Sequence, residues 1–335
     1  MTIMQRKAIR IAFADYKRPF VPDDNFVLDV LRRRYEVEIC DNPDFVIDMG
    51  LGHQYVYGDA VKILICGENS HPDFNFFDYA MGSDDMTFGD RYFRLPHFAT
   101  YPEFHSMKEV NGMSDVELLD RGFCSFVVSR GTGHHGDPMR ELFFNELSKY
   151  KKVASGGKFM NNVGGPVHDK LAFCRRYKFH IAFENSSSPG YTTEKLMQAF
   201  AADTVPIYYG NPAVGDDFRL EGLVLVRDKA DVKRAVEEVV FLDGNDKAYL
   251  EKCRAPRLVH PASWYYEGFE RFLFSIFDRS PEEARRLCPY GHISNYRKHI
   301  RKLYAYMGAV KAPERFLRAL RNVFVTPSEK AKTRA

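Results

Sequence analysis

The sequence predicts an α/β protein in which two Rossmann-like domains face a cleft. Short apolar runs rich in aromatic and β-branched residues alternate with stretches of helical period, which is typical of open, mostly parallel sheets. The alternation occurs in two successive halves, separated by a stretch rich in Gly, Lys and Asn at 151–165. The chain has 335 residues, which is enough for two hydrophobic cores. We expect one domain over 1–152, a second over 153–280 and basic C-terminal helices over 281–335.

The first half contains a helix at Phe26–Arg33 among short strands, followed by a polar loop at Met107–Glu117 and a helix at Met139–Tyr150. The runs that predict its strands are Ala8–Phe13, Tyr35–Ile39, Phe45–Met49, Lys62–Cys66, Tyr79–Met81, Tyr92–Leu95 and Phe123–Ser129. Each run is short, apolar and bounded by polar or turn-forming residues, as expected for buried strands.

The second half is organised around a strand–helix–strand unit. Lys178–Phe183 is an apolar strand, the following SSSPG stretch is turn chemistry, and Thr192 and Thr193 can cap a helix over Glu194–Ala202. A second strand over Thr204–Tyr209 completes a βαβ unit. The remaining predicted elements are helices at Asp169–Tyr177, Lys229–Leu242 and Asp246–Leu258 and a strand at Leu223–Val226.

The charge distribution, the apolar runs and the cysteine spacing exclude several classes of function. The net charge is +3, but residues from 295 onward carry eleven Lys or Arg against two Glu, so the remainder is net acidic and nucleic-acid binding is not expected. No apolar run is long enough to span a bilayer, and the N-terminus reads as neither a secretion signal nor a membrane anchor. The six cysteines are scattered, without metal-ligand or disulfide spacing. We expect buried, reduced thiols and a cytoplasmic location, with peripheral attachment to the inner face of the membrane left open.

The loop before the Glu194–Ala202 helix is suited to an anionic sugar ligand. A helix N-terminus offers free backbone N–H groups and the positive end of the helix dipole, which suit a phosphate. Lys195 adds a cation there, and Glu194 can accept hydrogen bonds from sugar hydroxyls. The alternative is an ordinary βαβ unit with a capped surface helix.

Two blocks of sequence resemble the α-1,3/1,4-fucosyltransferases, glycosyltransferase family 10, and most resemble the bacterial members. The first is GENSHPDFNFFDYAMGSDDMTFGDRYFRLP, and the second combines FENS, GYTTEK and PIYYGNP. Thr192 stands where the family usually has Val, and Tyr209 where it has Trp. The resemblance covers roughly residues 62–212, including RGFCSFVVS.

The resemblance implies the two-domain GT-B fold and an inverting transfer of L-fucose from GDP-β-L-fucose. It implies that the first domain binds the acceptor and the second binds GDP-fucose. The implied acceptor is the 3-hydroxyl of GlcNAc in a galactosyl-GlcNAc unit, with the 4-hydroxyl left open. The product would be a Lewis-type glycan on lipopolysaccharide or another surface polysaccharide. The resemblance implies that no cofactor is required and that a divalent metal is not essential.

The candidate catalytic residues are Glu68, Arg140 and Lys195. Glu68 follows a predicted parallel strand, where a carboxylate can remove the acceptor hydroxyl proton. Asp84 and Asp85 are the acidic alternatives. Arg140 and Lys195 would stabilise the negative charge of the departing diphosphate.

Three further donor-binding residues follow from the resemblance. Glu194 would bind ribose or fucose hydroxyls, and Tyr191 would stack on or bond to the nucleotide sugar. Asn185 would hold the loop or a phosphate, or would stabilise the turn without touching the ligand.

Other interpretations remain open. The chain could use another sugar donor or acceptor, or could bind a nucleotide sugar or glycan without turnover. GTGHHG at 131–136 fits a dinucleotide-binding pattern but lacks the acidic residue that should follow, and His134 and His135 are adjacent and poorly placed to share a metal. The basic C-terminal segment at Asn295–Arg321 would either contact an anionic membrane or pack back on the body as helices.

Overall fold

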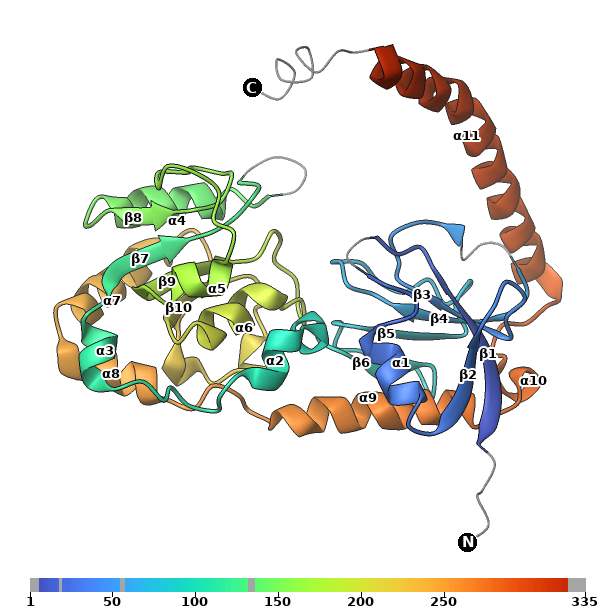
Figure 1. Ribbon diagram of the computed structural model, residues 1–335, viewed down its shortest axis with the longest axis horizontal. Coiled ribbons are helices and arrows are strands. Elements are labelled where there is room, and N and C mark those ends of the chain that lie inside the picture. The colour runs from blue at the N-terminus through green and yellow to red at the C-terminus, as the bar shows by residue number, and fades with distance from the viewer. Residues whose placement is uncertain (1–5, 18–19, 55–57, 132–135, 325–335) are drawn as a thin grey trace, which may run out of the picture.

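The computed structural model describes residues 6–17, 20–54, 58–131 and 136–324, with side chains described up to residue 310. The chain forms two lobes, each built on a parallel sheet, and a long helix, α9, runs from the junction between them along the underside of the first lobe (Figure 1). This arrangement confirms the predicted α/β class with two Rossmann-like domains, the GT-B architecture.

The first lobe contains a six-stranded sheet in the order β2-β1-β3-β4-β5-β6, with every pairing parallel. Its strands are β1 (Lys7–Ala14), β2 (Tyr35–Ile39), β3 (Phe45–Asp48), β4 (Val61–Ile65), β5 (Tyr79–Gly82) and β6 (Tyr92–Arg94). All residues of the central β4 are buried, which explains its continuous apolar sequence. Helix α1 (Phe26–Leu31) begins at Asn25, whose side chain accepts from the first free N–H groups.

The second lobe contains a five-stranded sheet in the order β11-β10-β9-β7-β8, also parallel. Its strands are β7 (Gly122–Phe126), β8 (Val153–Ser155), β9 (Tyr177–Phe183), β10 (Val205–Tyr209) and β11 (Val224–Leu225). Its helices are α3 (Asp115–Leu119), α4 (Met139–Ser148), α5 (Lys170–Cys174), α6 (Glu194–Ala201), α7 (Val232–Asp243) and α8 (Asp246–Arg254). Helix α6 is the crossover between β9 and β10, as the βαβ pattern predicts.

The predicted domain boundary at residue 152 is wrong. Strand β7, which we assigned to the first domain, pairs with β9 and β8 in the second sheet, with Cys124 opposite Phe179. The chain therefore changes lobes between β6 and β7, within residues 95–121. Pairing between strands some fifty residues apart leaves no local mark in the sequence, and the Gly-rich stretch that we took for a linker is a loop beside β8.

The predicted end of the second domain at residue 280 is also too late. Helix α9 (Ala262–Phe277) returns to the first lobe and packs its apolar face into the core of the six-stranded sheet. The residues on that face are Tyr265, Phe269, Leu273, Ile276 and Phe277. An amphipathic helix shows which face is buried but not which sheet will cover it.

The C-terminal region consists of the short helix α10 (Pro281–Ala284) and one long helix, α11 (Gly291–Phe324). Ile300 and Tyr304 pack against a small apolar cluster on the first lobe. Beyond this contact α11 rises away from the lobe (Figure 1). Within the described residues, no helix combines the length and apolarity needed to cross a membrane.

The lobes share part of one core. Between β6 and the second lobe lie a 3₁₀ turn (His97–Thr100) and α2 (Pro102–Ser106). Phe98 and Phe104 from this segment join Phe200 of α6 in the same cluster. Arg94 donates two hydrogen bonds to the buried carboxylate of Asp217, at 2.9 and 2.6 Å.

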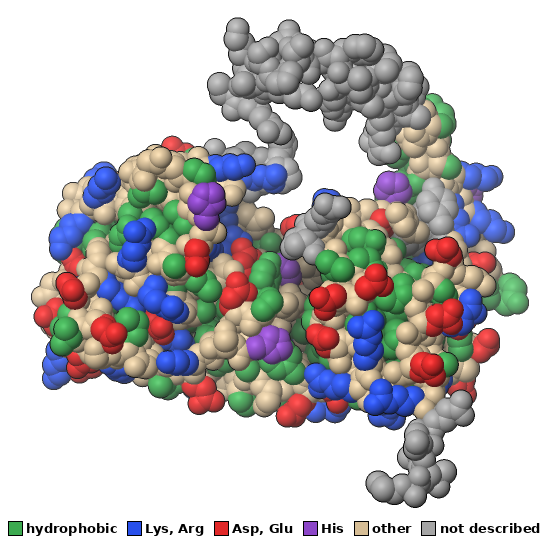
Figure 2. Space-filling view, in the orientation of Figure 1, with side chains coloured by type: hydrophobic (Ala, Val, Ile, Leu, Met, Phe, Trp, Pro, Cys, Tyr) green, Lys and Arg blue, Asp and Glu red, His purple; other side chains and the backbone are tan. Residues whose placement is uncertain are grey.

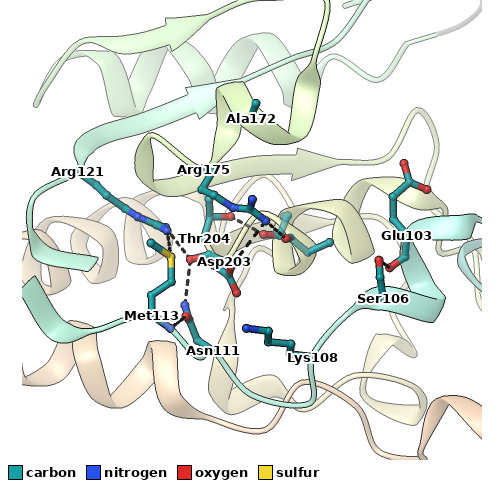
Figure 3. A network of polar contacts seen from close by, with 12 residues as sticks. Glu103, Ser106, Lys108, Asn111, Met113, Arg121, Ala172, Arg175, Asp203 and Thr204 are labelled. Carbon is teal, nitrogen blue, oxygen red and sulfur yellow. Dashed lines mark hydrogen bonds and ion pairs between the residues drawn. The ribbon is translucent and has the colours of Figure 1, made fainter. Parts of the chain in front are cut away.

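The segment that connects the lobes is fastened to the second one at Asp203 (Figure 3). Arg121 and Asn111 donate to the carbonyl oxygen of Asp203 at 2.7 and 3.1 Å. The carboxylate of Asp203 pairs with Arg257 at 2.6 Å. The predicted polar loop at Met107–Glu117 is thus held against the second lobe, and its Asn111 is buried.

Candidate active site

A pocket of about 830 Å³ lies where the two lobes meet. It is formed at the carboxyl ends of β1, β4, β7 and β9, the edge at which open α/β sheets hold ligands. Figure 2 shows this junction as a hollow between the lobes. The residues that line the pocket are Lys17, Glu68, Tyr101, Val127, Val128, Ser129, Arg130, Arg140, Lys170, Asn185, Glu194, Lys195 and Gln198.

Five of the six predicted site residues line this pocket, namely Glu68, Arg140, Asn185, Glu194 and Lys195. Tyr191 lies in the same loop as Asn185 but is almost fully buried. Burial and the neighbouring carboxylates raise the pKa of its hydroxyl, which stays protonated. The structure therefore brings together residues that are up to 127 positions apart, from Glu68 to Lys195.

Lys195 lies between two carboxylates. Its Nζ is 3.1 Å from Glu184 Oε2 and 3.2 Å from Glu194 Oε1. Burial alone would lower the pKa of Lys195, but the two carboxylates outweigh burial and raise it. Burial would likewise raise the pKa of Glu194, yet nearby cations, chiefly Lys195 and Lys170, hold it at about 2. Both side chains are therefore charged at neutral pH.

Glu184 is a site residue that sequence reasoning missed. It is fully buried at the end of β9 and accepts hydrogen bonds from the N–H and the hydroxyl of Thr193, at 2.8 and 2.7 Å. Thr193 is the N-cap position of α6, but its side chain makes no capping bond, contrary to our prediction, because its hydroxyl binds Glu184 and Lys195. The signal was available, since Glu184 follows a strand just as Glu68 does.

Arg140 lies in the first turn of α4 and is 3% exposed. Its guanidinium donates to the carbonyl oxygens of Phe183 and Arg130, at 2.9 and 2.8 Å. Burial lowers the pKa of Arg140, with Glu184 acting against that shift. Arg140 thus fixes the ends of two loops while its charge faces the pocket.

Lys170 is a second residue that sequence reasoning missed. It opens α5, and its Nζ donates to the neutral Gln198 Oε1 at 3.0 Å. No carboxylate among the described residues lies within ion-pair distance of it. Burial lowers the pKa of Lys170, and Glu194 acts against that shift. Nothing in the motif pattern indicated Lys170, since it lies on a different helix from Lys195.

The pocket carries an excess of positive charge. Five Lys or Arg side chains line it, as do the carboxylates of Glu68 and Glu194. A third carboxylate, Glu184, contacts Lys195, so the cations exceed the carboxylates by two charges. A diphosphate ester carries one negative charge on each phosphate and would balance this surplus. Asn185 also lines the pocket, and its buried Oδ1 has no hydrogen-bond partner among the described residues.

Glu68 occupies the first-lobe side of the pocket, three residues after β4. Within the described part of the chain its carboxylate makes no hydrogen bond or ion pair, so it is free to accept a proton. Asp84 is paired with His71 at 3.0 Å, and neither Asp84 nor Asp85 lines the pocket. The geometry therefore favours Glu68 over these two alternatives.

The remaining sequence hypotheses concern metals and dinucleotides. No group of three or more His, Cys, Asp or Glu side chains within the described residues is placed to hold a metal ion. Metal independence stays a prediction. His134 and His135 of the GTGHHG stretch lie outside the described residues. All six cysteines are free thiols, and four of them are buried as we predicted, whereas Cys40 is half-buried and Cys288 is exposed.

Two family models match consecutive parts of the chain. Residues 11–101 match a model described as the Alpha-(1,3)-fucosyltransferase FucT N-terminal domain. Residues 121–254 match a model described as Glycosyltransferase family 10 (fucosyltransferase) C-term. The region between the two matches coincides with the passage of the chain from one lobe to the other.

Individual fucosyltransferase sequences and solved structures are also similar to this chain. The chain is 32% identical over 263 residues to Alpha-(1,3)-fucosyltransferase FucT of Helicobacter pylori, covering 66% of this chain and 54% of that protein. It is 29% identical over 178 residues to Alpha-(1,3)-fucosyltransferase 4 of Rattus norvegicus, covering 52% of this chain and 40% of that protein. The chain thus spans about half the length of these curated relatives. A crystal structure of alpha1,3-fucosyltransferase with GDP-fucose superposes with a TM-score of 0.65 at 26% identity, covering 82% of this chain and 92% of that one.

Proposed function

Because this chain belongs to glycosyltransferase family 10, we propose that it transfers L-fucose from GDP-β-L-fucose to GlcNAc in a galactosyl-GlcNAc acceptor. The observation that carries the proposal is the pocket between the lobes, in which an unpaired carboxylate faces a surplus of cations. A solved alpha1,3-fucosyltransferase with GDP-fucose has the same fold, which supports the choice of donor.

The reaction proceeds in one step with inversion. Glu68 accepts the proton of the attacking hydroxyl as the new glycosidic bond forms. No covalent sugar–enzyme intermediate is needed, so one base is enough. The bond between fucose and the diphosphate breaks at the same time, and GDP leaves with an additional negative charge.

The cations of the second lobe stabilise that charge. Lys195 is held in place by Glu184 and Glu194, and Arg140 by two carbonyl oxygens, so neither has to reorganise during the reaction. No cofactor is required in this mechanism, because protein cations bind the leaving group.

The donor is oriented by the loop between β9 and α6. Glu194 stays ionised and accepts hydrogen bonds from ribose or fucose hydroxyls, and Asn185 Oδ1 accepts another. Tyr191, which is almost fully buried in the same loop, stacks on or bonds to the nucleotide sugar.

The acceptor enters from the first lobe, beside Glu68. We propose the 3-hydroxyl of GlcNAc as the nucleophile, with the 4-hydroxyl as the alternative, and a Lewis-type glycan on lipopolysaccharide or another bacterial surface polysaccharide as the product. The relatives in both sequence and structure carry 1,3 in their names, which favours the 3-hydroxyl.

Helix α11 suits peripheral contact with an anionic membrane from a cytoplasmic location. Its outward side presents large apolar residues, Leu303 at 50% and Tyr306 at 68% exposure, beside the exposed cations Lys298 and Lys302. Sedimentation with vesicles should show binding to phosphatidylglycerol but not phosphatidylcholine, and Lys298→Glu/Lys302→Glu should weaken it. Equal binding to both vesicles would contradict the proposal.

The decisive experiment is a transfer assay. The protein is incubated with GDP-fucose and either galactosyl-β1,3-GlcNAc or galactosyl-β1,4-GlcNAc, with and without EDTA, and the product linkage is mapped. We expect α-fucose on GlcNAc in both conditions. Transfer from another GDP- or UDP-sugar in a donor panel, but not from GDP-fucose, would show that the proposed donor is wrong. Tight GDP-fucose binding without transfer to any acceptor would instead identify a binding protein.

A further inference from the structure

The loop that carries Glu68 is joined to the donor loop by the next residue in the chain, Asn69. Asn69 Nδ2 donates to Ser186 Oγ at 2.7 Å, and Asn69 Oδ1 accepts from Ser188 Oγ at 2.6 Å. These bonds cross from the first lobe to the second, and both serines lie between Asn185 and Tyr191. One side chain thus connects the candidate base to the segment that would hold the sugar nucleotide.

The two loops also meet at the level of the backbone. Gly190 has a φ of +84°, and a Cβ atom there would lie 2.0 Å from the carbonyl oxygen of Ser83 in the first lobe. The N–H of Phe98 donates to the carbonyl oxygen of Thr192 at 3.3 Å. The donor loop is therefore enclosed by the first lobe on two sides, and Asn69 adds a side-chain bridge to this close approach.

Within its own lobe the Glu68 loop is held as a tight turn, and His71 at its end pairs with Asp84 at 3.0 Å. The N–H of Ser70 donates to the carbonyl oxygen of Glu68 at 2.8 Å, and the thiol of Cys66 donates to the same oxygen at 3.4 Å. These bonds set the shape of the turn but do not set where the carboxylate of Glu68 stands relative to the other lobe. The Asn69 bridge does.

We propose that Asn69 is a positioning residue that places Glu68 relative to the bound sugar donor. This inference rests on the proposed transferase function. Asn69 is exposed, so its two hydrogen bonds contribute little to folding stability. Small displacements of a base from its nucleophile nevertheless cost large factors in rate. The effect of removing the bridge should therefore appear in turnover and not in the melting temperature.

The first test is a kinetic cycle. Asn69→Ala should lower kcat about tenfold, with GDP affinity by calorimetry within about twofold of wild type. The Ser186→Ala/Ser188→Ala double variant should show a similar loss, and adding Asn69→Ala to it should cost nothing more. Ser187→Ala is the matched control, because its hydroxyl donates to the carbonyl oxygen of Gly210 within the second lobe. That control should keep wild-type kcat.

A second readout does not depend on turnover. Hydrogen exchange of the peptide covering 67–71 should slow when GDP is added to the wild type, and this protection should be lost in Asn69→Ala. An unchanged kcat in Asn69→Ala, additive losses in the cycle, or a loss of GDP affinity equal to the loss of kcat would each overturn the inference. A wild type that transfers no fucose but shows the GDP-dependent protection would refute the proposed function and leave the coupling between the loops intact.

Discussion

Replacing Lys195 tests whether this cation acts on the leaving group or merely balances buried carboxylates. Its Nζ contacts both Glu184 and Glu194, and its side chain is only 18% exposed. Lys195→Met would leave the buried Glu184 without a cation within ion-pair distance. Removing one partner of a buried ion pair costs about 3–5 kcal/mol. At roughly 2–4 °C per kcal/mol, the melting temperature should fall by roughly 6–20 °C.

The Glu184→Gln/Lys195→Met double variant separates stability from chemistry. A Gln at 184 can accept from the N–H of Thr193 and donate to its hydroxyl, and Glu194 keeps Lys170 as a neighbouring cation. The double variant should therefore recover most of the lost stability. Its turnover should remain reduced by on the order of 10²-fold, because a preorganised charge on the leaving group is missing.

The assay measures kcat for fucosyl transfer and the melting temperature of each variant in parallel. Recovery of stability without recovery of turnover supports a direct role for Lys195. If the double variant regained near-normal turnover together with stability, Lys195 would be a structural counter-ion and the leaving-group assignment would be refuted.

Three further predictions concern single side chains. Glu68→Gln should lower kcat by on the order of 10²-fold with unchanged GDP affinity, while Asp85→Asn, measured alongside, should leave both near wild type. Lys170→Met should weaken GDP binding about tenfold in calorimetry with little change in melting temperature, because Lys170 donates its hydrogen bond to the neutral Gln198 and not to a carboxylate. Burial, with a neighbouring carboxylate adding to it, raises the pKa of Asp48 to about 7, so the folded state keeps a proton that the unfolded state has lost. Stability should therefore fall as pH rises from about 4 to about 7, and Asp48→Asn should flatten that decline in urea midpoints.

The sequence predicted which residues line the pocket better than it predicted the division of the chain into lobes. Glu68, Glu194 and Lys195 were found because each lies next to a strand end or helix start that a local pattern reveals. Glu184 was missed because we used FENS only as a family motif and assigned no separate role to its carboxylate. Lys170 was missed because its approach to Glu194 depends on how α5 packs on α6. Proximity of that kind is a property of tertiary packing and has no sequence period.

The domain boundaries failed for a related reason. Strand β7 reads as a strand in either half, and only its pairing with β9 assigns it to the second sheet. The sequence of helix α9 shows an apolar face, but it does not show which of the two sheets that face packs against. Local patterns give the type of an element, whereas its partners are set by contacts between residues far apart in the chain.

The return of α9 to the first lobe bears on how the chain folds during synthesis. Residues 262–277 complete a hydrophobic core whose strands begin at residue 7. The N-terminal strands therefore cannot complete their core until a helix near the C-terminus has been synthesised. Until α9 has left the ribosome, β1 to β6 lack the helix that covers them and expose apolar surface that favours aggregation. The second lobe, inserted between these two parts, has no such delay. We therefore expect nascent chains to acquire structure in the middle first, and to depend on chaperones until the last helices emerge.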